Sequence, residues 1–185
     1  MTEQIRDASP HPRARITGVV YLLYFLTAIL AQLMVSRKLD AYGNAANLIA
    51  DGFYAVLTLL FYRLFKPVNR SLSFIAALVS LAGCAVMIFG LFPRVTLPIS
   101  PLVFFGPYCL LIGYLVFRST FLPRFLGVPM ALAGVGWLVF LLPAGEHYLS
   151  LYIEILGILA EASLMLWLIV MGVNVQRWKA QAGAA

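Results

Sequence analysis

One stretch decides the fold class of this chain: Ile16–Val35, which reads ITGVVYLLYFLTAILAQLMV and contains no charged residue. Crossing a hydrocarbon core about 30 Å thick takes roughly 20 apolar residues in a helix, and this stretch has that length. A cleaved signal peptide has a shorter apolar core and ends in a small-x-small site, which Ala31-Gln32-Leu33 does not provide. We therefore expect a retained transmembrane helix here.

Five further apolar segments follow along the chain. The sequence thus predicts six transmembrane helices, at residues 16–35, 45–65, 71–92, 102–117, 125–142 and 149–173. Prolines such as Pro67 and Pro123 stand in the turns between segments, where a helix must end. Residues 1–14 and 174–185 are polar and are expected to be tails, the first of them disordered, on either side of one transmembrane domain at residues 15–173.

The composition agrees with a membrane protein. The 185 residues are 63% hydrophobic and 11% charged, whereas soluble domains average about 45–50% apolar and about 25% charged residues. The net charge of +6 does not indicate nucleic-acid binding, because the basic residues lie in short clusters between apolar segments. We expect an all-α, polytopic bundle in the lipid bilayer of the inner (plasma) membrane, with no nucleic-acid partner.

Lysine and arginine are distributed unequally between the two predicted sides of the membrane. One side has three of the 13 basic residues, namely Arg37, Lys38 and Arg94. The other side has the remaining ten: Arg6, Arg13, Arg15, Arg63, Lys66, Arg70, Arg118, Arg124, Arg177 and Lys179. Because short cytoplasmic loops carry an excess of Lys and Arg, this bias predicts that both termini are cytoplasmic.

Three carboxylates fall inside predicted spans: Asp51 in the second, and Glu154 and Glu161 in the sixth. An ionised acid at membrane depth costs from roughly 2.5 kcal/mol upward, so these side chains are expected to face the bundle interior. Glu154 and Glu161 are nearly two helical turns apart and share one helix face, at heights that differ by about 10 Å. No Lys or Arg lies at mid-span, so the acids must be protonated, bound to a cation or hydrogen-bonded by neutral groups.

Neutral polar residues near these acids supply candidate partners. Asn47, Asp51 and Tyr54 follow one another at spacings of four and three, which places them on one helical stripe. Further candidate donors are Tyr21, Tyr24, Gln32, Tyr108 and Tyr152. Two interpretations stay open: a structural clasp of hydrogen bonds worth about 0.6–2 kcal/mol each, and a ligand- or proton-binding cavity that opens to the outer face. The candidate binding residues are Asp51, Glu154, Glu161, Asn47 and Tyr54.

Motifs of familiar enzymes are missing from the sequence, which has no GxSxG, Walker, HExxH or dinucleotide-binding pattern. Asp51, Glu154 and His147 near the outer surface would suit a divalent metal, but no pair of ligands has metal-motif spacing. We predict no catalytic residue, metal or cofactor. Cys84 and Cys109 lie in apolar segments and are expected to be buried thiols without a disulfide.

Glycines recur in pairs at seven-residue spacing within three of the predicted helices. The pairs are Gly83 and Gly90, Gly106 and Gly113, and Gly127 and Gly134. Small residues on one face let helix backbones approach closely in a membrane. We expect these pairs to be packing surfaces.

Three stretches together resemble a bacterial membrane family catalogued as domain of unknown function 4386. They are Arg15–Leu23 (RITGVVYLL), Tyr62–Leu72 (YRLFKPVNRSL) and Phe117–Gly127 (FRSTFLPRFLG). The resemblance runs from about Arg13 to Val173. It implies a compact six-helix bacterial protein, and it brings no agreed activity, substrate or catalytic residue.

The resemblance draws attention to the two basic turns. Arg63, Lys66, Arg70, Arg118 and Arg124 are candidates for contact with anionic lipid headgroups or with a partner protein. The alternative is that they only set the orientation of the chain in the membrane.

Three functions stay open on the sequence alone. The favoured one is binding or transport of a small molecule, an ion or a proton through an acidic intramembrane cavity. The second is a non-catalytic scaffold or partner subunit, with homo-oligomers as one form. An intramembrane metalloenzyme is the third.

Overall fold

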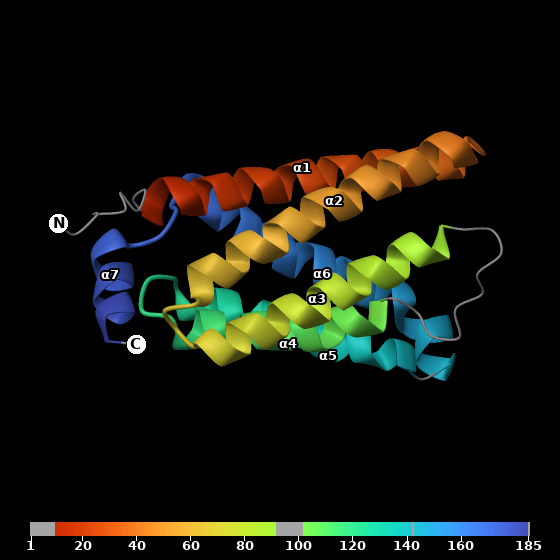
Figure 1. The fold of residues 1–185 in the computed structure, drawn as a ribbon. Coiled ribbons are helices and arrows are strands. Elements are labelled where there is room, and N and C mark those ends of the chain that lie inside the picture. Colours follow the sequence, from red (N-terminus) through yellow and green to blue (C-terminus); the bar gives the residue numbers. More distant parts are fainter. Residues whose placement is uncertain (1–9, 92–101, 142, 185) are drawn as a thin grey trace.

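The computed structural model describes residues 10–91, 102–141 and 143–184, and every regular element in these ranges is helical. The α-helices and the two short 3₁₀ turns, η1 and η2, are α1 (Pro10–Ser36), α2 (Asp40–Phe65), α3 (Arg70–Gly90), α4 (Leu102–Arg118), η1 (Arg124–Leu126), α5 (Gly127–Leu138), η2 (Val139–Leu141), α6 (Pro143–Val170) and α7 (Val175–Gly183) (Figure 1). The predicted all-α class is confirmed.

The first six α-helices form a ring in chain order. Each of α1 to α5 packs on the helix that follows it, and α6 closes the ring by packing on α1. The turns after α2 and α4 lie at the same end of the bundle as α7 (Figure 1). We call this the basic end and the opposite one the far end.

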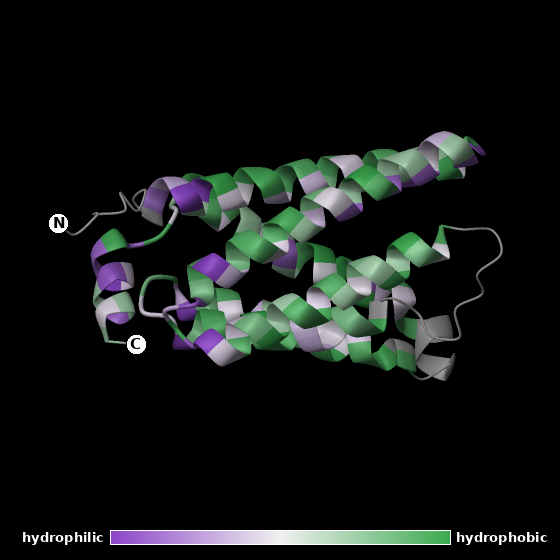
Figure 2. Ribbon diagram, viewed as in Figure 1, coloured by the Kyte–Doolittle hydropathy of each residue, from purple (hydrophilic) through white to green (hydrophobic). Residues whose placement is uncertain are grey.

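The helices have the length and surface of a membrane protein. In the part of the chain that the structure describes, four are long and apolar enough to cross a membrane: α1 from His11, α2, α3, and α6 over Leu149–Val170. Two shorter apolar stretches are Val103–Arg118 and Arg124–Leu138. Leu151 and Leu159 of α6 are 62% and 63% exposed, and hydrophobic residues cover the helices along their length (Figure 2). A water-soluble protein rarely exposes so much apolar surface, so the helices indicate a membrane-embedded protein.

Several helix boundaries differ from those expected. α1 begins at Pro10, within the stretch predicted as a disordered tail, because proline fits the first turn of a helix. α2 begins at Asp40 rather than at residue 45. The turn between α1 and α2 is short because Lys38 adopts a left-handed φ of 61° and Gly43 lies directly against Val35, where a Cβ would be 2.5 Å from its Cγ2.

The last two segments also depart from expectation. Residues 125–142 do not form one uniform helix, because α5 is flanked by η1 and η2. Residues 174–185 were expected to be a tail, but Val175–Gly183 form α7. The Asn174 side chain caps α7 by accepting a hydrogen bond from the Arg177 backbone N–H at 3.1 Å, which stabilises a helix start.

Helices α4 and α5 meet along a seam of glycines, formed by Gly106 and Gly113 of α4 and by Gly127 and Gly134 of α5. A Cβ at Gly113 would lie 2.8 Å from the Gly127 carbonyl oxygen, and one at Gly134 would lie 2.8 Å from that of Gly106. The packing role predicted for these two pairs is confirmed. Gly83 of α3 contacts Phe104 and Phe105 of α4 instead.

The interior of the ring is apolar over most of its length. Large side chains such as Leu57, Phe65, Leu115 and Leu164 are fully buried. Cys84 of α3 and Cys109 of α4 are buried and free, as predicted.

A pair of glycine-to-alanine substitutions tests the seam. Gly113→Ala forces its Cβ against the backbone of α5, and overpacking of this kind costs about 1–3 kcal/mol. Gly52→Ala on α2 has nothing within 4 Å of the new Cβ and gains about 0.5–1 kcal/mol of helix stability. We expect thermal unfolding in detergent to show opposite shifts of the midpoint. Equal shifts in the two variants would contradict the seam.

Candidate functional site

Polar side chains gather inside the helix ring around Glu161 of α6. Glu161 is only 9% exposed, and its carboxyl group lies within hydrogen-bonding reach of the Tyr21 hydroxyl of α1. The hydroxyls of Tyr24, Tyr54 and Tyr108 also interact electrostatically with Glu161. Four helices, α1, α2, α4 and α6, therefore contribute to one cluster.

Aromatic contacts hold the tyrosines of this cluster together. The rings of Tyr24 and Tyr54 have centroids 4.7 Å apart, and those of Tyr54 and Tyr108 are 6.0 Å apart. Ring pairs at these distances add roughly 0.5–1.5 kcal/mol beyond their burial. The hydroxyls are thus positioned by packing between helices.

Asp51 of α2 is the second buried acid, with 5% of its side chain exposed. It precedes Tyr54 by nearly one turn toward the far end, and it interacts electrostatically with Tyr24 and Cys84. Tyr24 therefore interacts electrostatically with both Asp51 and Glu161. Among the described residues, no lysine or arginine acts on Asp51 or Glu161. We call Tyr21, Tyr24, Asp51, Tyr54, Tyr108 and Glu161 the acid–tyrosine cluster.

Local sequence explains how α1 reaches Glu161. Gly18 lies so close to α6 that a Cβ there would be 2.8 Å from the Ile169 backbone nitrogen. Tyr21 follows Gly18 by three residues and so projects from nearly the same face of α1. A larger residue at position 18 would push α1 away from α6 and separate Tyr21 from Glu161.

A line of hydroxyl groups extends the cluster toward α3. Thr58 Oγ1 donates to the Tyr54 carbonyl at 2.9 Å and lies 2.7 Å from Ser80 Oγ. Because the Thr58 proton is committed to Tyr54, Ser80 donates to Thr58. The buried Tyr108 hydroxyl has no partner in hydrogen-bonding geometry within the described ranges, although Thr58 lies near it. The Tyr108 hydroxyl therefore keeps unused hydrogen-bonding capacity inside the bundle.

The predicted binding residues have different outcomes. Asp51, Tyr54 and Glu161 come together in the cluster, and Asn47 lies half-buried one turn from Asp51 on α2. Glu154 is exposed, so the expectation that it faces the bundle interior is wrong. Glu154 precedes Glu161 by nearly two turns toward the far end, where α1 and α6 diverge (Figure 1).

Other sequence candidates lie outside the cluster. Tyr152, named as a possible donor, is 70% exposed. The side chain of His147, considered for a metal site, lies outside the described residues. In the part of the chain that the structure describes, no three His, Cys, Asp or Glu side chains gather around a common point. The two buried carboxyls and the tyrosine hydroxyls suit a proton or a small cation, because both bind to oxygen atoms.

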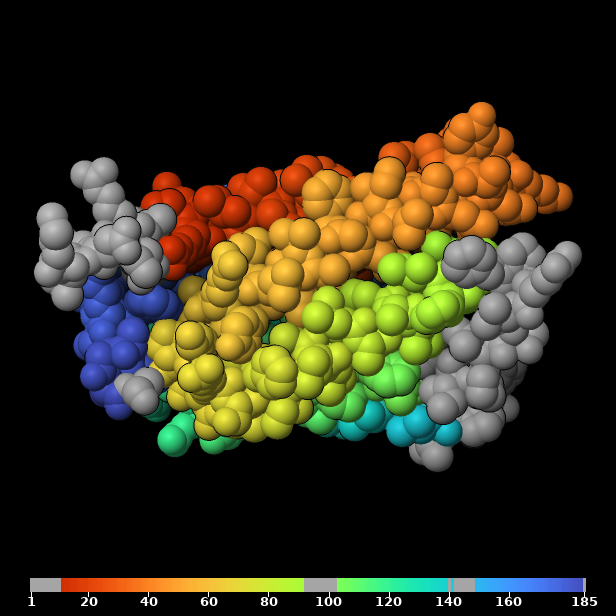
Figure 3. Space-filling model, in the orientation of Figure 1, coloured from red at the N-terminus to blue at the C-terminus, as the bar shows by residue number. Residues whose placement is uncertain are grey.

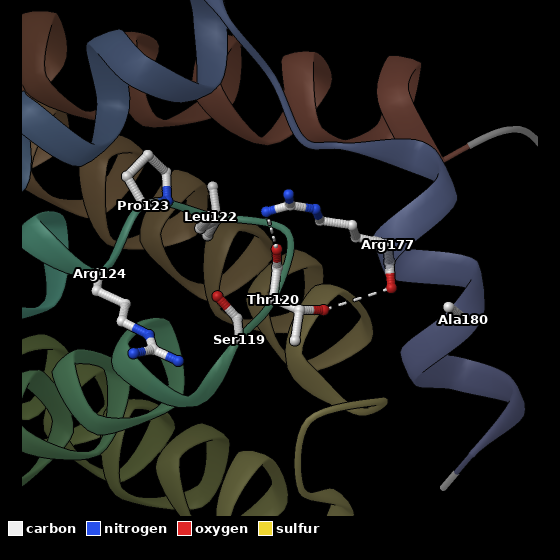
Figure 4. A pocket seen from close by; sticks show the side chains of 7 residues that line it. All are labelled: Ser119, Thr120, Leu122, Pro123, Arg124, Arg177 and Ala180. Atoms are coloured by element: carbon white, nitrogen blue, oxygen red, sulfur yellow. Dashed lines mark hydrogen bonds between the residues drawn. The ribbon is translucent and has the colours of Figure 1, made fainter.

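The basic end holds a second group of polar residues, which sequence reasoning missed in part. An open pocket of about 590 Å³ lies between the turn after α4 and helix α7. Its lining is Ser119, Thr120, Leu122, Pro123, Arg124, Arg177 and Ala180 (Figure 4).

Hydrogen bonds hold α7 against this turn. Gln181 Oε1 accepts from the Thr120 backbone N–H at 3.1 Å and from the Thr120 hydroxyl at 3.0 Å. The Arg177 guanidinium donates to the Thr120 carbonyl at 3.5 Å (Figure 4). Sequence reasoning missed these contacts because the C-terminal segment was taken as a tail; the signal that could have found them is Asn174 as a helix cap.

The five basic residues predicted to contact lipid or a partner divide between two turns. Arg63, Lys66 and Arg70 lie around the turn from α2 to α3, and Arg118 and Arg124 flank the turn from α4 to α5. The Arg124 guanidinium lies 5.7 Å from the centre of the Phe117 ring.

Comparison with known proteins assigns a family to the second half of the chain. Residues 96–172 match the family described as Domain of unknown function (DUF4386). This region is therefore similar to the DUF4386 family. The DUF4386 match includes α4, α5, all of α6 and Glu161, but it does not reach Asp51 or the tyrosines of α1 and α2. No curated protein and no solved structure matches the chain.

The Thr58–Ser80 hydrogen bond is open to a double-mutant cycle with Thr58→Val and Ser80→Ala. Hydrogen bonds between helices in a membrane average about 0.6 kcal/mol and reach about 1.7 kcal/mol. We expect a coupling free energy in this range from unfolding in detergent. A coupling near zero would show that the two hydroxyls do not bond in the folded protein.

Proposed function

We propose that this protein binds a proton or a small cation at Glu161 and Asp51 and carries it across the membrane. One observation supports this most: two acids are buried in an apolar helix ring, and no described lysine or arginine acts on either of them. Acids inside a membrane are costly, and they usually mark proton relays or ion pathways.

The proposal includes a six-span topology with both termini in the cytoplasm of a cell whose plasma membrane holds the chain. Helices α1, α2, α3 and α6 meet the length for a span. α4 and the continuous run of η1, α5 and η2 are shorter, but a short span is accommodated by local thinning of the bilayer. Six spans put the two ends of the chain on one side, and the basic end is then cytoplasmic by its charge.

The energetics favour an occupied site. A carboxylate inside the ring has lost its water, and the tyrosine hydroxyls replace only part of that hydration. A proton or a bound cation removes the uncompensated charge. Asp51 lies closer to the far end than Tyr54, and Tyr24 interacts with both acids. The order Asp51, Tyr24, Glu161 therefore gives a polar route from the far end into the bundle.

The alternative of a scaffold has less support from the packing. The glycine faces of α4 and α5 contact one another within the chain, so they are not open to a partner. An intramembrane metalloenzyme has no described ligand group to support it.

Substitution of the buried acid tests the proposal through the pH dependence of stability. If Glu161 is charged only at a cost in the folded state, folding takes up protons and stability rises as the pH falls. We expect the unfolding midpoint of the wild type to rise between about pH 8 and about pH 5. At the higher pH, Glu161→Gln should be at least as stable as the wild type, with a gain of about 2.5 kcal/mol in the free energy of unfolding. The variant should also lose most of the pH dependence.

Glu154→Gln is the matched control, because Glu154 is an exposed acid on the same helix. It should keep the pH dependence of the wild type. Repeating the measurement with added Na⁺, K⁺ or Mg²⁺ separates proton binding from cation binding. A Glu161→Gln variant that is simply less stable, beside a wild type that responds to neither pH nor cations, would make the cluster a structural clasp.

The topology is tested by labelling single introduced cysteines with a membrane-impermeant maleimide in intact cells. Lys38→Cys, in the turn between α1 and α2, should be labelled directly. Ala182→Cys, in α7, should be labelled only after permeabilisation. The native Cys84 and Cys109 are buried and should give a low background. Equal labelling of positions 38 and 182 in intact cells would contradict the topology.

A further inference from the structure

A second open pocket at the basic end is lined by cationic side chains. It has a volume of about 570 Å³ and is lined by Arg13, Arg63, Lys66, Pro67, Arg70, Trp178 and Ala182. These residues come from the start of α1, the end of α2, the following turn, the start of α3, and α7. These segments converge at one end of the molecule (Figure 3). We call this the basic pocket.

Three cations of the basic pocket lie away from every described carboxylate. Arg63, Lys66 and Arg70 are exposed and form no ion pair there. The described carboxylates are Asp40, Asp51, Glu154 and Glu161, and they lie toward the far end or inside the bundle. Cations held this close repel one another, so a bound anion stabilises the folded protein.

The backbone adds to this positive field. α3 begins at Arg70, and the Asn69 side chain caps it by accepting from the Leu72 N–H at 2.9 Å. The start of a helix carries a partial positive charge, which favours an anion close by. The α3 terminus thus reinforces the side chains.

The walls of the basic pocket are fixed by contacts between distant parts of the chain. The Trp178 indole N–H donates to the Leu64 carbonyl at 3.0 Å, which holds α7 against the end of α2. The Arg13 carbonyl accepts from the Thr17 hydroxyl at 2.8 Å, and Pro67 is buried in the turn. The cations are therefore mounted on a rigid frame, which lowers the entropy lost on binding.

An apolar recess continues from the basic pocket. A smaller cavity of about 70 Å³ shares Arg13, Arg63 and Trp178 with it and extends along Thr17, Leu60 and Leu64. Tryptophan favours the interface between water and lipid. The basic pocket therefore has a polar mouth beside an apolar recess at the interface between water and lipid. This combination suits a phosphate group attached to a lipid better than a free phosphate ion.

We propose that the basic pocket binds the phosphate of an anionic lipid headgroup. Arg63 and Arg70 donate hydrogen bonds to the phosphate oxygens, Lys66 and Arg13 supply further positive charge, and Trp178 contacts the glycerol region. This site is separate from the acid–tyrosine cluster and does not depend on transport.

The test is a titration of the full chain, purified in a neutral detergent, with short-chain phosphatidylglycerol. The measured quantity is the lipid concentration that gives half of the maximal rise in the unfolding midpoint. Short-chain phosphatidylcholine and inorganic phosphate are titrated in parallel. The pocket variant is Arg63→Gln with Arg70→Gln, and the matched control is Arg118→Gln with Arg124→Gln, which removes equal charge from the other turn.

We expect phosphatidylglycerol to stabilise the wild type at concentrations where phosphatidylcholine does not. The pocket variant should need at least roughly tenfold more phosphatidylglycerol, and the control should stay within about twofold of the wild type. Arg63 and Arg70 are exposed and unpaired among the described residues, so the variant should fold. Lys66→Gln alone should give a smaller shift in the same direction.

Two results would overturn the proposal. Equal losses in the pocket variant and the control would mean diffuse attraction of the basic end to anionic lipid. Stabilisation by inorganic phosphate at the same concentration as by phosphatidylglycerol would assign the basic pocket to a soluble phosphate compound.

Discussion

The close approach of α1 to α6 at Gly18 is the contact on which the rest of the structure depends. Helices α1 to α5 pack in chain order, and only the contact of α6 with α1 closes the ring. In a membrane, apolar side chains gain little by leaving lipid for protein, so helix association relies on close backbone packing and internal polar contacts. Gly18 allows the close backbone packing. It also positions the internal polar contact, because it brings Tyr21 beside Glu161.

The same closure creates the polar interior. An open row of helices would expose Glu161 to lipid, whereas the ring surrounds it with tyrosines from three other helices. The ring loosens toward the far end because α1 and α6 diverge there, and Glu154 is exposed as a result. The two acids of α6 thus have very different surroundings. Glu161, near the contact with α1, belongs to the acid–tyrosine cluster, and Glu154 does not.

The basic end is organised by α7. This short helix is bonded to the turn after α4 through Gln181 and to the end of α2 through Trp178. It therefore joins the two basic turns and separates their cations into distinct pockets. The two proposed sites lie in different parts of the fold: one is acidic and enclosed within the ring, and the other is basic and open at its end.

The sequence by itself determined the membrane class, the approximate positions of the apolar helices and the presence of acids at Asp51 and Glu161 inside them. These follow from local properties, because span length and the cost of a charge in lipid are readable from consecutive residues. Glycine spacing likewise predicted packing faces on α4 and α5, since residues seven apart lie on one helix face, but only the structure shows that these two faces meet.

Only the tertiary structure decided which polar residues meet. The sequence placed Glu154 and Glu161 on one helix face, but the angle between α1 and α6 determines that one is covered and the other is not. The grouping of Arg13 with Arg63 and Trp178, and the docking of α7, depend on contacts between residues 50 or more positions apart. Periodicity within one helix carries no information about such contacts, because they are set by how whole helices pack.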